Sequence, residues 1–293
     1  MKPIVIVGPT GVGKTKLSIE LAKRLDGEII NADSTQVFKN LNIATAKVTK
    51  EEMEGIPHHL IDIKEITEDY TVYDYQKDCR KKIEEIVYRK KTPIIVGGTG
   101  LYIKAALYDY QFEEENKKQD YSNYSIDELY EKLILVDPNT SIHKNNRKRV
   151  ERALNYYLNN NDKKEKNGNK LLYDSIFIGL TTNRDILYDR INKRVDIMIE
   201  NGLIDEAKKI YNLGLKTKAI LTPIGYKELF EYFDGNKSIE ESIDLIKQRS
   251  RRYAKRQYTW FNNQMNIKWF DVDFSNFNNT VFNVYNYILK KKW

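Results

Sequence analysis

Hydrophobic positions along the chain fall into two patterns, short apolar runs and longer stretches with helical spacing. The apolar runs are rich in isoleucine and valine, which predicts buried strands. Strands are predicted at Pro3–Val7, Glu28–Asp33, Pro93–Val96, Ser175–Leu180 and Ile267–Val272. Helices are predicted from Lys14 to a cap at Gly27, at Val72–Arg89, Ile186–Ile199 and Ile239–Phe261, and at the C-terminus. Strands that alternate with helices predict an α/β fold with a parallel sheet.

The texture of the sequence changes after residue 111. Short amphipathic helices are predicted within 126–136 and 150–157. A polar low-complexity linker follows at 159–170. We therefore predict a small all-helical domain at 112–170, inserted into a core that consists of residues 1–111 and 171–293.

Composition limits the class of protein. Of 293 residues, 41% are hydrophobic, which is enough for a core, but no apolar run approaches the ~20 residues that a membrane span needs. Only Met1 and Lys2 precede the first strand, so we expect neither a signal peptide nor an association with a membrane. The single cysteine, Cys79, excludes an intramolecular disulfide and suits a reducing compartment. We therefore expect a cytoplasmic protein, and we take it to be a monomer.

A phosphate-binding motif follows the first predicted strand. The octet Gly8-Pro9-Thr10-Gly11-Val12-Gly13-Lys14-Thr15 fits the pattern G-x-x-x-x-G-K-[ST]. Between a strand and a helix, its backbone N–H groups and the positive helix end form an anion site. Lys14 would bring a mobile charge to the outer phosphate, and the Thr15 hydroxyl would bind Mg²⁺. A glycine-rich turn that fits by chance is the alternative. The motif predicts a diphosphate or triphosphate ligand without naming the reaction.

Polar residues follow two later strands of the predicted sheet. Asp33 ends the second strand and precedes three further hydrogen-bonding residues, Ser34-Thr35-Gln36. The segment Gly97-Gly98-Thr99-Gly100 follows the third strand. Ligands of open α/β sheets bind at the carboxyl ends of the strands, so we expect both segments to face the phosphate loop. A surface carboxylate and a tight turn are the plain alternatives, although these glycines also suit a close approach of backbone to a ligand.

Basic residues are concentrated in three places. Arg190 and Arg194 lie four residues apart on one predicted helix face, where they could close over phosphates or pair with Asp189 or Asp196. Residues 143–154 carry five Lys or Arg with one acid, which also suits a plain exposed helix face. Residues 247–256 carry six Lys or Arg and no acidic residue, and aromatic residues are interleaved with them. Charge of one sign is explained better by contact with nucleic-acid phosphates than by a solvated face.

The two adjacent histidines do not predict a metal site. His58 and His59 lie on an extended segment, so their side chains point to opposite faces. They cannot both ligate one metal ion without distortion of the backbone. We therefore expect packed or hydrogen-bonded histidines, and the sequence contains no zinc-ligand pattern and no internal repeat.

Several segments resemble the bacterial tRNA dimethylallyltransferases, also called tRNA isopentenyltransferases. The matching segments are Asp33–Phe38, Ile43–Lys47, Ile56–Asp62, Gly97–Tyr102, Pro223–Leu229 and Arg252–Phe261. They follow the family patterns D-S-x-Q-V-Y, I-G-T-A-K, P-H-H-L-I-D, G-G-T-G-L-Y, A-I-G-Y-K-E-L and R-Y-A-K-R-Q-x-T-W-F. Phe38 and Ala44 replace the family's usual Tyr and Gly. The resemblance runs from Pro3 to about Asp271 and is weakest between residues 110 and 140.

This resemblance implies a P-loop NTPase-like fold and alkyl transfer to RNA. A dimethylallyl group would pass from dimethylallyl diphosphate to the exocyclic amine of the adenosine on the 3′ side of the tRNA anticodon. The phosphate loop would hold the diphosphate leaving group rather than ATP, with Mg²⁺ as cofactor. Asp33 would accept the amine proton, and Thr99 would contact the substrate. Gln36 would help to seat an adenine flipped out of the anticodon stem-loop.

The resemblance also implies a set of tRNA contacts and a catalytic arginine. The family's tRNA-touching segment H-P-N-N-x-x-R-V-x-R-A-L matches here with Lys144 in place of the proline. The predicted tRNA-binding residues are Asp33, Ser34, Thr35, Gln36, Lys148, Arg149, Val150, Glu151, Arg152, Arg252 and Arg256. The family's catalytic arginine, early in the insertion, has no counterpart, because no arginine occurs between Arg89 and Arg147. We assign that catalytic role to Arg194, which matches the family pattern R-I-x-x-R-V-D-x-M.

Three other functions fit parts of the sequence. A P-loop small-molecule kinase shares the phosphate loop and an Asp after the second strand, but the basic aromatic helix argues against it. An adenylate isopentenyltransferase shares the chemistry and would have little need of that helix. A non-enzymatic RNA-binding protein would not need Asp33 and Thr99 beside the phosphate loop.

Overall fold

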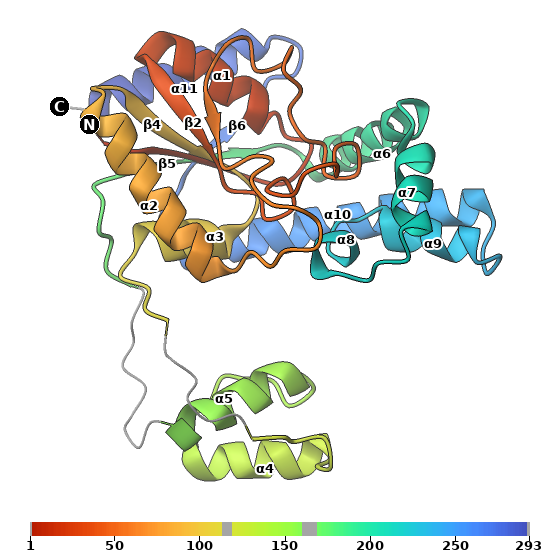
Figure 1. The fold of residues 1–293 in the computed structure, drawn as a ribbon. Coiled ribbons are helices and arrows are strands. Elements are labelled where there is room, and N and C mark those ends of the chain that lie inside the picture. The colour runs from red at the N-terminus through yellow and green to blue at the C-terminus, as the bar shows by residue number, and fades with distance from the viewer. Residues whose placement is uncertain (1, 113–118, 160–168, 292–293) are drawn as a thin grey trace. The chain divides into compact units, whose positions relative to one another are not determined.

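The structure is a computed structural model, and it describes residues 2–112, 119–159 and 169–291. The chain forms two compact units, one made of Met1–Tyr110 with Lys170–Trp293 and the other of Gln111–Asn169. Figure 1 shows the larger unit as a sheet flanked by helices and the smaller unit as a small group of helices. Among the described residues, no helix is both long and apolar enough to cross a membrane.

The larger unit is built on a six-stranded sheet in which every neighbouring pair of strands is parallel. The strands are β1 (Ile4–Val7), β2 (Gly27–Asn31), β3 (His58–His59), β4 (Thr92–Val96), β5 (Ile176–Thr181) and β6 (Lys268–Asp271). Their spatial order is β3-β2-β4-β1-β5-β6, which confirms the predicted α/β fold. The loops that follow β1, β2 and β4 therefore lie at one edge of the sheet, where ligands of such folds bind.

Helices cover both faces of this sheet (Figure 1). The helices of the larger unit are α1 (Lys14–Leu25), α2 (Val72–Tyr88), α3 (Gly100–Leu107), α6 (Arg184–Glu200), α7 (Leu203–Asn212), α8 (Lys218–Leu221), α9 (Tyr226–Phe233), α10 (Ile239–Gln264) and α11 (Phe277–Lys291). Helices α1 and α11 share a core with Ile4 and Ile6 on one face. Helices α2 and α3 share a core with Val5 and Val7 on the other. Strand β1 is thus apolar on both sides, as parallel strands between two helix layers are.

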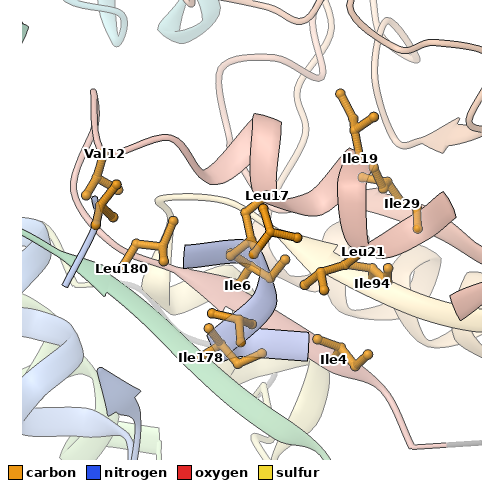
Figure 2. Close-up of a cluster of buried hydrophobic side chains, with 14 of the residues drawn as sticks. Ile4, Ile6, Val12, Leu17, Ile19, Leu21, Ile29, Ile94, Ile178 and Leu180 are labelled. Atoms are coloured by element: carbon orange, nitrogen blue, oxygen red, sulfur yellow. The ribbon is translucent and has the colours of Figure 1, made fainter. Parts of the chain in front are cut away.

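Figure 2 shows the core that supports the phosphate loop. Leu17 and Leu21 of α1 pack with Ile4 and Ile6 of β1, all of them fully buried. Val12, from the middle of the loop, belongs to the same core. The hydrophobic pattern of the first 25 residues therefore fixes both the helix and the loop that precedes it.

Helices α6 to α10 form a further core beside the sheet, which includes Val37 and Leu41 from the segment after β2. Helices α7, α8 and α9 are not among the predicted elements. Glu206 of α7 accepts hydrogen bonds from the backbone N–H groups of residues 42–44 at 2.9–3.0 Å and from the Tyr226 hydroxyl at 2.8 Å. This carboxylate holds the segment that follows Asp33 against the helices.

Two predicted boundaries are wrong. The cap of α1 is Asp26, in the left-handed conformation at φ 45°, and not Gly27. Gly27 lies in β2, where a Cβ atom would be 2.8 Å from the side chain of Ile94, so close packing explains this glycine. Strand β2 ends at Asn31, two residues before Asp33, because the Asn31 side chain hydrogen-bonds the backbone of Asp33 and turns the chain there.

The smaller unit contains α4 (Ile126–Val136) and α5 (Arg147–Asn159), which confirms the two helices predicted there. Its own core is formed by Tyr121, Leu129, Leu133, Val150, Ala153 and Leu154. Ser125 caps α4 through the N–H of Glu128, whose carboxylate returns a bond to the Ser125 N–H. Most of the linker predicted at 159–170 lies outside the described residues.

Candidate active site

The phosphate loop connects β1 to α1 and is shaped by two glycines. Gly8 has φ 143°, and a Cβ atom there would lie 2.6 Å from the carbonyl oxygen of Leu180. Gly13 has φ 96°, and a Cβ atom would lie 2.9 Å from the ring of Phe277. Between them, the side chain of Val12 is buried in the core, so only its backbone can face a ligand. The loop therefore has the glycines and the supported backbone that an anion nest requires.

Lys14 is folded back onto this loop. Its Nζ donates to the carbonyl oxygens of Gly8 at 3.0 Å and Pro9 at 2.7 Å. Burial and the nearby Arg194 lower the pKa of Lys14 to about 7, and Asp33 acts in the opposite direction. Two neighbouring cations in partly buried positions repel each other, so an anionic ligand between them would stabilise both.

Arg194 of α6 reaches the phosphate loop. Its Nη1 donates to Oγ1 of Thr10 at 3.3 Å. The two aspartates that were its alternative partners, Asp189 and Asp196, pair with Lys193 and Lys247 instead. Burial lowers the pKa of Arg194, whereas Asp33 raises it.

The neighbouring Arg190 has a different place. Its Nε donates to the carbonyl oxygen of Gly11 at 3.2 Å, and its guanidinium lies 3.8 Å from the centroid of the Phe274 ring. Arg190 therefore contacts the backbone of the loop at Gly11. Arg194 is the arginine whose charge lowers the pKa of Lys14.

Asp33 is held in place by a buried residue that sequence reasoning missed. The Asn31 amide accepts a hydrogen bond from the Asp33 N–H and donates to the Asp33 carbonyl oxygen, both at 3.0 Å. Asp33 Oδ1 accepts from the N–H and the hydroxyl of Thr35 at 3.0 and 2.7 Å. In the part of the chain that the structure describes, Oδ2 has no hydrogen-bond partner. One carboxylate oxygen is thus fixed and the other is available. A polar Asn inside an apolar strand was the signal that could have found this support.

Thr99 lies beside Asp33 at the start of α3. Its Oγ1 accepts from the Ser34 N–H at 3.0 Å and lies 3.2 Å from the Ser34 hydroxyl, and its N–H donates to the Ala32 carbonyl oxygen at 3.1 Å. The predicted neighbour Gln36 instead donates both hydrogen bonds of its amide nitrogen to the backbone of residues 45–46. The loops after β2 and β4 are therefore brought together, as predicted.

The glycines around Thr99 have a cause other than the predicted approach to a ligand. A Cβ atom at Gly97 would lie 2.2 Å from the backbone of Ala32, and one at Gly100 would lie 2.1 Å from the Trp260 ring. Protein atoms from the second strand's end and from α10 fill the space that a side chain would need. Close packing within the protein is thus sufficient to explain these glycines, and the approach of their backbone to a ligand stays a prediction.

Two residues of α10, Tyr253 and Gln257, border the site next to Gly98. Burial, followed by the charge of Asp33, raises the pKa of Tyr253, so this group is a neutral hydroxyl beside Thr99 and Gln257. The Gln257 amide bonds the backbone of Thr10 and Gly98. Both residues lie in a segment that we interpreted from the sequence as an RNA contact. Their spacing of four with the buried Phe261 was the signal of an inward helix face.

The donor set of the crevice fits Mg²⁺ bound together with phosphate. Among the described residues, no three His, Cys, Asp or Glu gather in a metal cluster. Mg²⁺ is typically held by one or two protein oxygens together with substrate phosphates. Thr15 is exposed in the first turn of α1, next to Lys14, and the Asp33 carboxylate is close enough to act on the charge of Lys14. These groups suit a metal ion that arrives with a diphosphate.

The histidines and the cysteine have structural roles within the described part of the chain. His59 bonds the buried Glu28 at 2.7 Å, and His58 Nδ1 lies 2.8 Å from the Ile56 carbonyl oxygen, which confirms hydrogen-bonded histidines. Cys79 is fully buried in α2, and burial raises the pKa of its thiol to about 12.

Three of the six cations in the basic segment of α10 have partners within the protein. Lys247 pairs with Asp196, Arg249 with the buried Glu228, and Arg251 donates to Asn192. Contact of this helix with RNA, through Arg252 and Arg256, stays a prediction. Arg249, Arg252, Lys255 and Arg256 are exposed, and Arg249 is so in spite of its ion pair. Arg252 and Arg256 line a depression of about 320 Å³ together with Lys227 and Arg249.

The predicted tRNA contacts of the smaller unit also divide. Lys148, Arg149 and Arg152 are exposed on α5. The Val150 side chain is fully buried in the unit's own core, so the predicted contact of this residue with tRNA would have to involve its backbone. Glu151 forms an ion pair with Arg147 at 2.6 Å, which explains an acid in the basic segment.

Comparison with known proteins decides the family. Residues 36–264 match the family model described as IPP transferase, which covers more than half of the chain. The chain belongs to the IPP transferase family. A curated relative from Anoxybacillus flavithermus, named tRNA dimethylallyltransferase, is 52% identical over 283 residues, which is 92% of this chain and 90% of the relative. A protein of the same name from Bacillus cereus is 50% identical over 285 residues, with 92% and 90% covered.

Solved structures agree with this assignment to the IPP transferase family and its P-loop NTPase-like core. The full-length tRNA isopentenylpyrophosphate transferase from Bacillus halodurans is 46% identical, with a TM-score of 0.78 over 99% of this chain and 96% of that one. A eukaryotic dimethylallyltransferase, described as acting on tRNA, is 32% identical with a TM-score of 0.81 over 92% of this chain and 73% of that one.

Proposed function

We propose that this IPP transferase family member is a tRNA dimethylallyltransferase, a prenyl transferase that acts on tRNA. The single observation that carries the mechanism is the available Oδ2 of Asp33, in a carboxylate whose charge acts on both Lys14 and Arg194. A base beside an anion site suits a reaction in which a proton is lost as an anionic leaving group departs.

The donor and acceptor are inferred from the family and the site together. The donor is dimethylallyl diphosphate, held by the backbone of the phosphate loop, by Lys14 and by Arg194. The acceptor is the exocyclic amine of the adenosine on the 3′ side of the anticodon, extruded from the stack of the anticodon stem-loop. The exposed Arg252, Arg256 and the basic residues of α5 would contact tRNA phosphates.

The reaction balances as an alkyl transfer. The adenine amine nitrogen forms a bond to C1 of the dimethylallyl group while the C1–O bond breaks, and the electron pair leaves with the diphosphate. Lys14 and Arg194 stabilise the charge that develops on the leaving oxygen. Asp33 Oδ2 accepts the proton that the amine loses, while Oδ1 stays bonded to Thr35. Thr99, oriented by Ser34, would contact the reacting amine.

Mg²⁺ fits as the cofactor of this site. Thr15 would hold it, with phosphate oxygens as its other ligands, and the bound ion would add charge stabilisation to the departing diphosphate. The residues named above perform the remaining roles, which are positioning and proton transfer.

The decisive experiment offers several acceptors to one preparation. The protein is incubated with dimethylallyl diphosphate and Mg²⁺ together with tRNA, adenosine monophosphate or adenosine alone, and the products are separated and mass-analysed. We expect prenylated adenosine only from tRNA. Product from adenosine monophosphate alone would favour an adenylate isopentenyltransferase, and phosphorylation of a small molecule with ATP would favour a kinase.

A further inference from the structure

We infer that Gln257 is a positioning residue for the phosphate loop, so that diphosphate binding depends on a residue of the helix that carries predicted tRNA contacts. The inference rests on the proposed function for the identity of the ligand. Gln257 lies on α10, 247 positions from Thr10 in the sequence, and the residue is 5% exposed. A buried amide needs hydrogen-bond partners. The two partners of this amide, Thr10 and Gly98, both belong to the candidate site.

Both ends of the Gln257 amide are used by loops of the site. Oε1 accepts the Thr10 N–H at 3.0 Å, and Nε2 donates to the Gly98 carbonyl oxygen at 3.1 Å. A Cβ atom at Gly98 would lie 2.1 Å from Nε2. Gly98 therefore leaves the space that this amide occupies, and the amide ties the loop after β1 to the loop after β4.

The bond to Thr10 fixes the orientation of one peptide plane. The peptide between Pro9 and Thr10 is trans, so its C=O points away from its N–H. With the N–H held by Gln257, the Pro9 carbonyl oxygen faces the opposite side, where it accepts from Lys14 Nζ at 2.7 Å. The hydroxyl of Thr10 accepts from Arg194 at 3.3 Å. One held residue thus sets the position of both cations.

Removal of the Gln257 amide should therefore affect a ligand that it does not contact. The Thr10 N–H would lose its buried partner, the peptide plane would be free to rotate, and Lys14 and Arg194 would lose their common support. The outer face of α10 would be unchanged, because Arg252 and Arg256 are exposed whereas Gln257 points inward. Diphosphate binding should weaken while tRNA binding is kept.

The test compares two identical changes on the same helix. Gln257→Met removes both hydrogen bonds while the new side chain keeps a similar length. Gln248→Met is the matched control at an exposed position of α10. Binding of inorganic diphosphate with Mg²⁺ is measured by titration calorimetry, and tRNA binding by gel shift. We expect diphosphate affinity to fall roughly fivefold or more in Gln257→Met, on the scale of one lost hydrogen bond, and to be unchanged in Gln248→Met. The KM for dimethylallyl diphosphate should rise in parallel, with unchanged tRNA affinity in both variants.

A second pair of variants separates positioning from folding. Gly98→Ala should displace the amide and cause the same loss, and Gly98→Ala combined with Gln257→Ala should bind diphosphate no more weakly than Gln257→Ala does, because both act through one contact. Wild-type diphosphate affinity in Gln257→Met with only a lowered melting temperature would overturn the inference, as would fully additive losses in the double variant. If the wild-type protein itself fails to bind diphosphate, the proposed function falls and the inference falls with it.

Discussion

Lys14 should take up a proton when diphosphate binds. In the free protein, burial and Arg194 lower its pKa to about 7 against the opposing effect of Asp33. At pH 8 the free side chain is therefore about nine-tenths neutral. A bound diphosphate favours the charged form and raises the pKa of Lys14 again. Each binding event should then take up about 0.9 proton at pH 8 and about 0.1 at pH 6.

Titration calorimetry in buffers of different ionisation enthalpy counts these protons. Lys14→Arg is the control, because arginine stays charged throughout this pH range. Protonation of the diphosphate itself contributes equally to both proteins, so the difference between them isolates Lys14. Affinity of the wild type should also fall relative to Lys14→Arg as pH rises above 7, by up to about tenfold per pH unit.

The sign of this prediction makes it easy to refute. The neutral form dominates only above the lowered pKa, so the extra proton must be seen at pH 8 and be nearly lost at pH 6. Equal proton counts for the wild type and Lys14→Arg at pH 8 would mean that Lys14 is already charged in the free loop. There would then be no lowered pKa of Lys14 to support the inference that repulsion between Lys14 and Arg194 favours a bound anion.

Other substitutions test separate parts of the site and the fold. Asp33→Asn should lower the single-turnover transfer rate ~10²–10⁴-fold and leave diphosphate affinity intact; a loss under about tenfold would mean that Asp33 is not the base. Arg252→Gln and Arg256→Gln should each flatten the salt dependence of tRNA binding by about one unit on a log–log plot, whereas an unchanged slope would make this helix face structural. Glu206→Gln should lower the free energy of unfolding by about 1–3 kcal/mol in urea denaturation, since the N–H groups of residues 42–44 lose a charged acceptor; an unchanged midpoint would contradict that.

Local features of the site could be predicted from the sequence, because their determinants lie close together along the chain. The phosphate loop is set by glycines within eight residues and by the apolar pattern on either side. The convergence of Asp33 and Thr99 follows from their positions after neighbouring parallel strands. These inferences need only the periodicity of strands and helices.

Features that depend on distant contacts could not be predicted. For Arg194, the sequence left open an ion pair with Asp189 or Asp196. In the structure these aspartates pair with Lys193 and Lys247. The basic charge of α10 looked uniform in the sequence, yet Arg249 is paired with a buried Glu228 that lies 21 residues earlier. Gln257 looked like part of an RNA-contacting run, and only its contact with Thr10 gives it a place in the site.

The position and stoichiometry of the modification test the account most directly. Unmodified tRNA is incubated with the wild-type protein, dimethylallyl diphosphate and Mg²⁺, released diphosphate is counted, and the tRNA is digested and mapped by mass spectrometry. We predict one diphosphate released for each five-carbon group gained, with every group on the exocyclic amine of the adenosine next to the anticodon on its 3′ side. Diphosphate release without modified tRNA, or modification at any other nucleotide, would contradict the proposed function.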